Sequence, residues 1–270
     1  MRAVCVVALV SIPSLLLPMQ GRDGAQIVAL VSIFAAVFTL VEYSVASPSF
    51  IEFRSAPPFN RLRFIALFAT VVALSLIVRG NEAPSTLTRL MQIMGERAGG
   101  SMDFPFSPVR LMVLMMPADS PDHVAYMMRV SAGLAYLVSL VSIAVFVILL
   151  RFQHWPRRNG AFNVWVNLPM FDPTAGGDVV ARLNRDCQVN LILGFLLPFV
   201  FPALGKLVSL FVTPITLTDP QTLIWMVAAW AFLPASLLMR GIALSRVAQM
   251  IHMQRKRAYA RAAAEGLLPV

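Results

Sequence analysis

The sequence is short of charge. Only 13% of its 270 residues are charged, against roughly 25% in an ordinary soluble domain. Because 58% of the residues are hydrophobic, a single soluble domain would leave large apolar patches in contact with water. This balance excludes a soluble globular protein and predicts an integral membrane protein.

Metal, disulfide and catalytic motifs are also missing. The two cysteines, Cys5 and Cys187, form no CxxC pair and have no histidine at ligand spacing, which argues against a zinc site or a disulfide framework. The three histidines, His123, His154 and His252, fall at or beyond the ends of apolar runs, so a pair of intramembrane haem ligands is excluded. No GxSxG, phosphate-loop or dinucleotide-binding motif occurs. We therefore predict no catalytic residue, no metal and no cofactor.

Lysine is scarce, and nearly all of the 22 basic residues are arginine. The net charge of +9 fits the positive-inside rule of membrane proteins better than nucleic-acid binding, because no block of charge resembles a nucleic-acid reader. The arginine bias and the compact loops favour a bacterial inner-membrane protein from a GC-rich genome. We predict a lipid bilayer environment and no nucleic-acid partner.

Six apolar runs come close to the length of about 20 residues that crosses about 30 Å of hydrocarbon. They cover residues 3–19, 26–47, 64–79, 124–150, 190–215 and 221–239. We expect an all-α six-helix transmembrane bundle over residues 1–240, followed by a basic cytoplasmic tail over 241–270. The first run also resembles a signal peptide. It lacks a small-residue cleavage site, so a retained helix is favoured, and cleavage stays open.

Orientation follows from the basic residues of the short connections. With the N-terminus in the cytoplasm, every cytoplasmic segment is net positive and the long outer loop, residues 80–123, is slightly negative. An even number of spans then places both termini in the cytoplasm. The cytoplasmic arginines ahead of the tail are Arg2, Arg54, Arg61, Arg63, Arg151, Arg157, Arg158, Arg182 and Arg185.

Two segments of the outer loop have helical patterns. Residues 85–94 place Leu87, Leu90, Met91 and Met94 on one face, which predicts a short amphipathic helix at the membrane surface. Residues 108–117 are apolar nearly all round and too short to cross a bilayer, so we expect an interfacial or re-entrant helix there.

The two cytoplasmic loops are rich in aromatic side chains, proline and arginine. Residues 162–169 alternate in a way that predicts a short extended segment, and a helix beginning near Gly177 is expected to run into the fifth span. Aromatic and arginine side chains often anchor protein interfaces, so these loops are predicted to contact lipid headgroups or other membrane subunits. The candidate interface residues are Phe53, Arg54, Phe59, Arg61, Trp165 and Phe171.

Ionisable residues inside predicted spans are functional candidates by default. Glu42, Arg129 and Lys206 fall in this class. Glu42 lies about 8 Å from the cytoplasmic end of its span and Lys206 about 24 Å from that side, at 1.5 Å per residue, so the two cannot pair. We expect Arg129 and Lys206 to pair with acids of the outer loops, and these acids are Asp119, Asp122 and Asp219.

These patterns favour a non-catalytic accessory, assembly or stabilising subunit of a larger bacterial membrane complex. The alternative is a small-solute transporter, because Pro198 and Pro202 would kink the fifth span just before Lys206. A third possibility is a lipid-acting enzyme with Arg54, Arg61 and Arg63 as headgroup contacts, but it lacks a nucleophile or metal site.

Overall fold

The computed structural model describes residues 1–17, 22–46, 49–117, 120–152, 155–156, 162–172, 174, 176–209, 211 and 219–265. Within these ranges the secondary structure is helical and no strand occurs, which confirms the all-α prediction. The helices are α1 (Arg2–Leu16), α2 (Arg22–Ser44), α3 (Phe59–Arg79), α4 (Thr86–Met102), α5 (Pro108–Met115), α6 (Asp122–Phe152), α7 (Val164–Asn167), α8 (Val179–Val208) and α9 (Pro220–Ala264).

Five described helices, α2, α3, α6, α8 and α9, are long and apolar enough to cross a membrane. The chain therefore has the architecture of a multi-pass helical membrane protein. The predicted first span corresponds to α1, which is apolar but has only 15 residues. At 1.5 Å per residue it covers about 22 Å, less than the roughly 30 Å of a hydrocarbon core.

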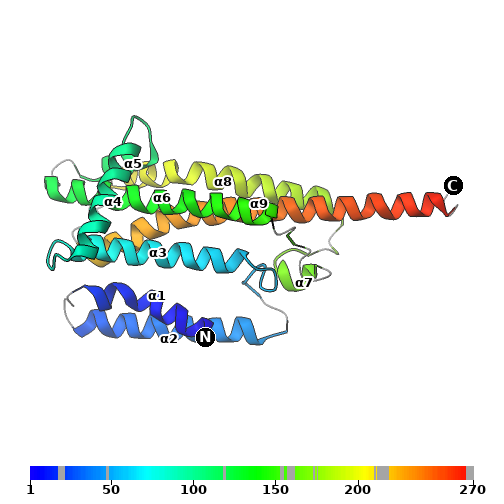
Figure 1. Ribbon diagram of the computed structural model, residues 1–270, viewed down its shortest axis with the longest axis horizontal. Helices are drawn as coiled ribbons and strands as arrows, with labels where there is room; N and C mark the ends of the chain where they lie inside the picture. The colour runs from blue at the N-terminus through cyan, green and yellow to red at the C-terminus, as the bar shows by residue number, and fades with distance from the viewer. Residues whose placement is uncertain are drawn as a thin grey trace.

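Four long helices, α3, α6, α8 and α9, run side by side, and α1 and α2 form an antiparallel hairpin along one flank (Figure 1). Helix α4 crosses one end of this bundle, with α5 next to it, and α7 lies toward the other end. We call these the α4 end and the α7 end. The Arg2 guanidinium lies 4.0 Å from the ring centroid of Tyr43, so the start of α1 and the end of α2 share one level.

Helix α9 spans 45 residues, or about 68 Å at 1.5 Å per residue. Its length is more than twice a hydrocarbon core, so it extends well beyond the bundle at the α7 end (Figure 1). The helix passes through residue 240 without a break. The predicted division between a membrane domain and a tail at that residue therefore falls inside one continuous helix.

Helix α8 begins at Val179, because the Asp178 side chain accepts a hydrogen bond from the backbone of Ala181 and caps the helix. The predicted helix start after Gly177 is thus confirmed. Pro198 and Pro202 both lie within α8 without interrupting it. Proline has no N–H, so Pro202 leaves the carbonyl of Pro198 without its usual donor. The indole Nε1 of Trp230 donates to that carbonyl at 3.0 Å, so a side chain of α9 replaces the missing donor.

Two other local expectations have clear outcomes. The helix expected at 85–94 is present and longer, as α4, and begins at a capping box between Ser85 and Thr88. The expectation of an extended segment over 162–169 is wrong, since residues 164–167 form the one-turn helix α7. Its valines alternate as in a strand, but Asn163 caps the turn by accepting from the backbone N–H of Val166 at 3.3 Å.

Two apolar clusters form the interior of the part of the chain that the structure describes. The first lies toward the α4 end and is built from α3, α5, α6 and the first half of α9, with contributions from α1. The second lies at the α7 end and joins the loop before α3, the end of α6, the α7 segment, the start of α8 and the second half of α9. The second cluster therefore brings together both loops that the sequence marked as cytoplasmic.

Candidate functional site at the α7 end

An aromatic cluster around Phe53 holds the two loops together. The Phe53 side chain is 1% exposed, and its ring centroid lies 4.6 Å from that of Phe59 and 5.6 Å from that of Trp155. Its backbone N–H donates to the carbonyl of Asn167 at 2.7 Å. The Asn167 side-chain oxygen also accepts from the backbone N–H of Ser55 at 3.0 Å. Residues 112 positions apart in the chain thus form one packed unit.

This packing changes the interpretation of the predicted interface residues. Phe53, Phe59 and Phe171 are all buried, so their rings are occupied within the protein and are not available to a partner. The sequence marked them as surface anchors because it does not show that the two loops pack on each other. Arg61 is exposed, and its assignment to an interface stays a prediction, whereas the Trp165 side chain lies outside the described residues.

Arg54 and Glu42 together fasten the loop to the end of α2. The Arg54 guanidinium donates to the carbonyls of Glu42 and Val45, at 2.8 and 2.7 Å, which are among the unpaired acceptors at a helix C-terminus. The buried Glu42 carboxylate accepts in return from the backbone N–H groups of residues 49–51, at 3.0 to 3.3 Å. Both residues therefore have a structural role in shaping this loop.

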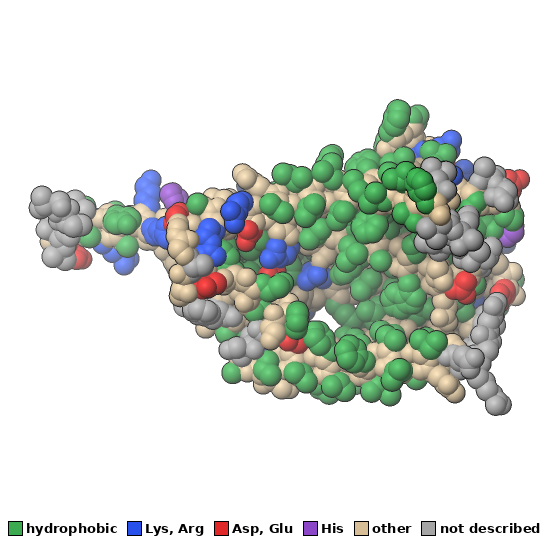
Figure 2. Space-filling view, turned by 180° about the vertical axis from the view of Figure 1, so that it is seen from behind, with side chains coloured by type: hydrophobic (Ala, Val, Ile, Leu, Met, Phe, Trp, Pro, Cys, Tyr) green, Lys and Arg blue, Asp and Glu red, His purple; other side chains and the backbone are tan. Residues whose placement is uncertain are grey.

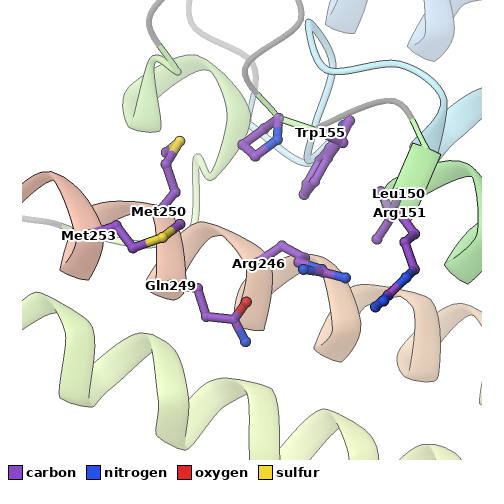
Figure 3. A pocket seen from close by; sticks show the side chains of 8 residues that line it. Leu150, Arg151, Trp155, Arg246, Gln249, Met250 and Met253 are labelled. Carbon is purple, nitrogen blue, oxygen red and sulfur yellow. The ribbon is translucent and has the colours of Figure 1, made fainter.

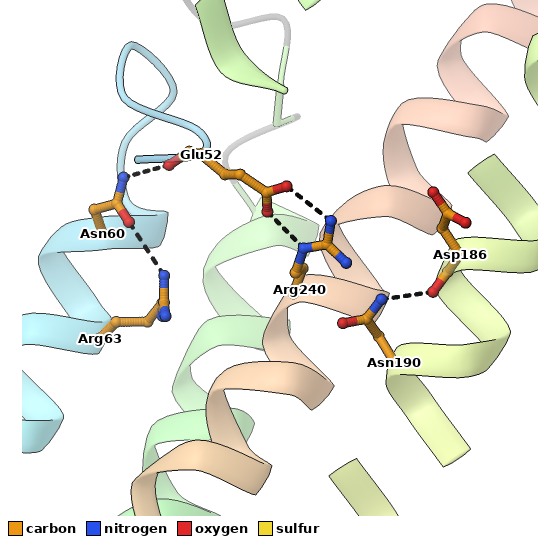
Figure 4. Close-up of polar contacts among 6 residues, drawn as sticks. All are labelled: Glu52, Asn60, Arg63, Asp186, Asn190 and Arg240. Carbon is orange, nitrogen blue, oxygen red and sulfur yellow. Dashed lines mark hydrogen bonds and ion pairs between the residues drawn. The ribbon is translucent and has the colours of Figure 1, made fainter. Parts of the chain in front are cut away.

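A buried ion pair connects the same loop to α9 (Figure 4). Both oxygens of Glu52 accept from the Arg240 guanidinium, at 2.5 and 2.7 Å. Glu52 is 7% exposed, and a charge this deep is tolerated only with such bidentate pairing. Arg240 lies 20 residues into α9, or about 30 Å along it at 1.5 Å per residue. Neither residue stood out in the sequence, because they are 188 positions apart.

Arg63 and Asn60 extend this polar group (Figure 4). The Asn60 amide donates to the Glu52 carbonyl at 2.6 Å, and its oxygen accepts from Arg63 at 3.4 Å. The Arg63 guanidinium also lies 5.0 Å from the Phe59 ring centroid, within cation–π range. Its Nε is buried and has no hydrogen-bond partner among the described residues.

A second ion pair links the beginning of α8 to the far part of α9. Asp178, the residue that caps α8, pairs with the guanidinium of Arg255. This hydrogen bond is the main cause that lowers the pKa of the Asp178 carboxyl below its ordinary value. The contact holds α8 against α9 beyond the end of the apolar bundle.

The predicted intramembrane cations lie at the opposite, α4 end. Arg129 lies 3.8 Å from the carboxylate of Asp103, which is an outer-loop acid but not one of the three expected partners. Lys206 is in the last turn of α8 and donates to the backbone carbonyl of Met116 at 3.0 Å. Asp219 caps α9 instead of pairing with Lys206, and Asp119 lies outside the described residues. The structure therefore does not bring Glu42, Arg129 and Lys206 together.

The polar side chains at the α7 end have a structural role. We call the ion pair between Glu52 and Arg240, which joins the loop before α3 to α9, the clasp. Both oxygens of Glu52 are engaged by Arg240, so this carboxylate serves to join the loop to α9. In the part of the chain that the structure describes, no group of three or more His, Cys, Asp or Glu side chains could hold a metal ion. The polar side chains there hold loops and helices in place.

Helix α9 ends in a basic arm, which we define as residues 256–264. Almost every residue of the arm is exposed, and it extends past every other labelled helix (Figure 1). Lys and Arg side chains gather on this projection, whereas hydrophobic side chains dominate the flank of the bundle (Figure 2). Lys256, Arg257 and Arg261 make no ion pair among the described residues, and the arm contains no acid.

Comparison with known proteins adds no family to this description, since no family model, no curated protein and no solved structure matches the chain. The class that the fold defines is thus a multi-pass helical membrane protein. Any function must be argued from its own geometry.

Proposed function

We propose that this chain is a non-catalytic accessory, assembly or stabilising subunit of a larger bacterial inner-membrane complex. In this proposal both termini lie in the cytoplasm, and the basic arm docks on an acidic surface of a partner subunit. The observation that carries the proposal is the arm itself, a helical extension with three unpaired cations and no tertiary cover.

The direction of the arm distinguishes a protein partner from a lipid surface. The arm continues α9 along the axis of the bundle (Figure 1). When the long helices cross the membrane parallel to this axis, the arm points away from the bilayer. It begins 16 residues beyond Arg240, or about 24 Å farther along the helix at 1.5 Å per residue. A polar headgroup layer is only about 5–8 Å deep. The arm is thus out of reach of headgroups and available to a protein.

The charge of the arm favours an acidic partner. Arg257 and Arg261 are four residues apart and lie on one helix face, where like charges repel each other. An acidic surface would relieve this repulsion and steer association. Alanine, lysine and arginine are good helix formers, so the arm stays helical without cover.

The membrane part offers a second surface for a complex. Only 11% of the apolar window of α2 is buried inside the protein, and its side chains Leu30, Phe34 and Val41 are largely exposed. Helix α2 packs on α1, and its remaining sides face lipid or another subunit. Helix α2 therefore exposes a larger share of its apolar surface than α9 does, since 56% of the apolar window of α9 is buried.

Transport is the weaker proposal. It relied on a fifth span that Pro198 and Pro202 would kink just before the intramembrane charge of Lys206. Helix α8 is continuous, its freed Pro198 carbonyl is bonded to Trp230, and Lys206 lies in the final turn with its ammonium bonded to a backbone carbonyl. These contacts engage the freed carbonyl and the ammonium group within the protein, which supports a structural role for Lys206.

Purification from the native membrane in mild detergent tests the proposal. We expect a stoichiometric partner to co-purify with the wild-type chain and to be lost from the variant R257E/R261E. The matched control is R89E/R97E, which reverses two exposed arginines of α4 at the other end. A wild-type chain that purifies alone would overturn the proposal, and so would a partner that both variants retain equally.

A further inference from the structure

A cavity at the α7 end is not explained by the arm or by the clasp. It has a volume of about 270 Å³ and lies between the end of α6, the Trp155–Pro156 segment and α9 (Figure 3). This is close to the lower limit of small-molecule pockets, about 300 Å³, so it suits a headgroup rather than a whole lipid. Its main lining side chains are Arg151, Trp155, Arg246, Gln249, Met250 and Met253.

Two arginines give this cavity an excess of positive charge. The guanidinium groups of Arg151, from α6, and Arg246, from α9, are turned toward one another (Figure 3). Neither makes an ion pair with an acid in the described part of the chain. Two converging cations repel each other, and a phosphate between them would remove this repulsion through charge-assisted hydrogen bonds. The amide of Gln249 adds a neutral donor at the same wall.

The depth of the cavity matches a headgroup layer. Arg151 is 29 residues from the first residue of α6, or about 44 Å along the helix. A bilayer measures about 40–45 Å including its headgroups. Arg246 is six residues beyond Arg240, or about 9 Å past the 30 Å point of α9, close to the outer face of a headgroup layer about 5–8 Å deep. Both arginines therefore lie near the outer face of the headgroup layer when the bundle spans a bilayer.

The surface of α6 leads from this level into the hydrocarbon. Val141, Val145 and Ile148 are 37 to 52% exposed and recur at helical spacing, so they form one apolar stripe that ends at Arg151. An acyl chain that lies on this stripe places its phosphate beside the Arg151 guanidinium. A free phosphate has no acyl chain, so it would make no contact with the stripe or with the Met250 and Met253 side chains that line the cavity.

We propose that the cavity lined by Arg151 and Arg246 binds the phosphate headgroup of an anionic glycerophospholipid from the leaflet on the α7 side, with an acyl chain along the exposed stripe of α6. The headgroup sits between the two guanidinium groups, and Trp155 forms the apolar wall of the site. Because the bound lipid contacts both α6 and α9, it acts as a structural ligand that couples the two helices.

Native mass spectrometry of the full chain in mild detergent tests this site. The probes are phosphatidylglycerol, the zwitterionic phosphatidylethanolamine and soluble glycerol 3-phosphate. We expect the wild-type chain to retain phosphatidylglycerol in preference to phosphatidylethanolamine. In R151Q/R246Q retention should fall roughly tenfold or more, since each basic residue near an anionic surface contributes about 1 kcal/mol. The matched control R89Q/R97Q removes two exposed arginines of α4 at the other end and should change retention less than about twofold.

Two further measurements distinguish the possible explanations of a loss of lipid. The variant R151K/R246K keeps both charges and should retain most of the lipid, which separates loss of charge from loss of fold. If R151Q/R246Q binds phosphatidylglycerol as well as the wild type does, the site is wrong. If glycerol 3-phosphate displaces the lipid at comparable concentration, the cavity is a site for a soluble phosphate and the lipid assignment is overturned.

Discussion

The two ends of the bundle are held together in opposite ways. At the α4 end, α4 crosses α6 through glycines, and a Cβ on Gly133 would lie 2.3 Å from the Cα of Gly99. At the α7 end, large side chains fill the space, and Glu52 and Arg240 form a buried ion pair. The α4 end is therefore sensitive to added atoms, while the α7 end is sensitive to lost ones.

This difference follows from what each end has to join. Two helices that cross in a membrane gain mainly from close backbone approach, which small residues permit. Gly95 and Gly99 of α4 face Val130 and Arg129 of α6 in the same way. The α7 end joins irregular loops, whose backbone polar groups must be satisfied individually. Arg54, Asn60 and Asn167 serve this purpose there.

The largest effect is expected where the α4 end admits no extra atom. Gly133→Ala should destabilise the protein by about 3 kcal/mol, the upper part of the range for overpacking, because backbone and not a flexible side chain blocks the new methyl group. Thermal unfolding in detergent measures the change. Gly100→Ala is the control, since a Cβ there meets nothing within 4 Å and improves helix propensity. Equal effects of the two substitutions on thermal unfolding would contradict the close crossing of α4 and α6 at Gly133.

The α7 end should instead respond to the loss of a charge. Glu52→Gln leaves the Arg240 guanidinium without its counter-charge in a mostly buried position. Breaking a fully buried pair costs about 3–5 kcal/mol, and we expect about 2 kcal/mol because the Arg240 side chain is 27% exposed. Thermal unfolding again gives the value.

A second variant separates pairing from packing at this end. Replacing both partners, as E52Q/R240M, should recover much of the stability lost in Glu52→Gln, since no unpaired charge remains. If the double variant is as unstable as the sum of Glu52→Gln and Arg240→Met, the pair is not coupled and the clasp is disproved.

The sequence predicted the α4 end better than the α7 end, for a physical reason. Helical periodicity and capping are local, so α4 was recognisable from neighbouring residues, and at the α7 end the same was true only of the start of α8 at Asp178. The contacts of Glu52 with Arg240 and of Phe53 with Asn167 join distant segments, and nothing near either partner marks them. The same nonlocality made buried Phe59 and Phe171 look like surface anchors. Gly99 and Gly133 were likewise individually unremarkable until their helices crossed.

The smallest expected effect is a pH dependence at the α7 end, where Asp178 joins α8 to α9. The Arg255 guanidinium lowers the pKa of Asp178 below its ordinary value, about 3.9 in model peptides. The folded state thus binds this proton less readily than the unfolded state. The contribution to stability is complete above the ordinary pKa and is lost as the pH falls through the folded pKa.

Amide hydrogen exchange of residues 179–182, followed from pH 5 to pH 2.5 and corrected for intrinsic exchange, should show loss of protection on the acid side. In R255Q the pKa of Asp178 should rise, so the same loss should begin at higher pH. D178N should show no transition in this range, because asparagine still caps the helix but has no carboxyl group to titrate. A transition that keeps its position in R255Q would mean that the α8 cap alone, without α9, sets the acid response, and the far ends of the two helices would then be independent.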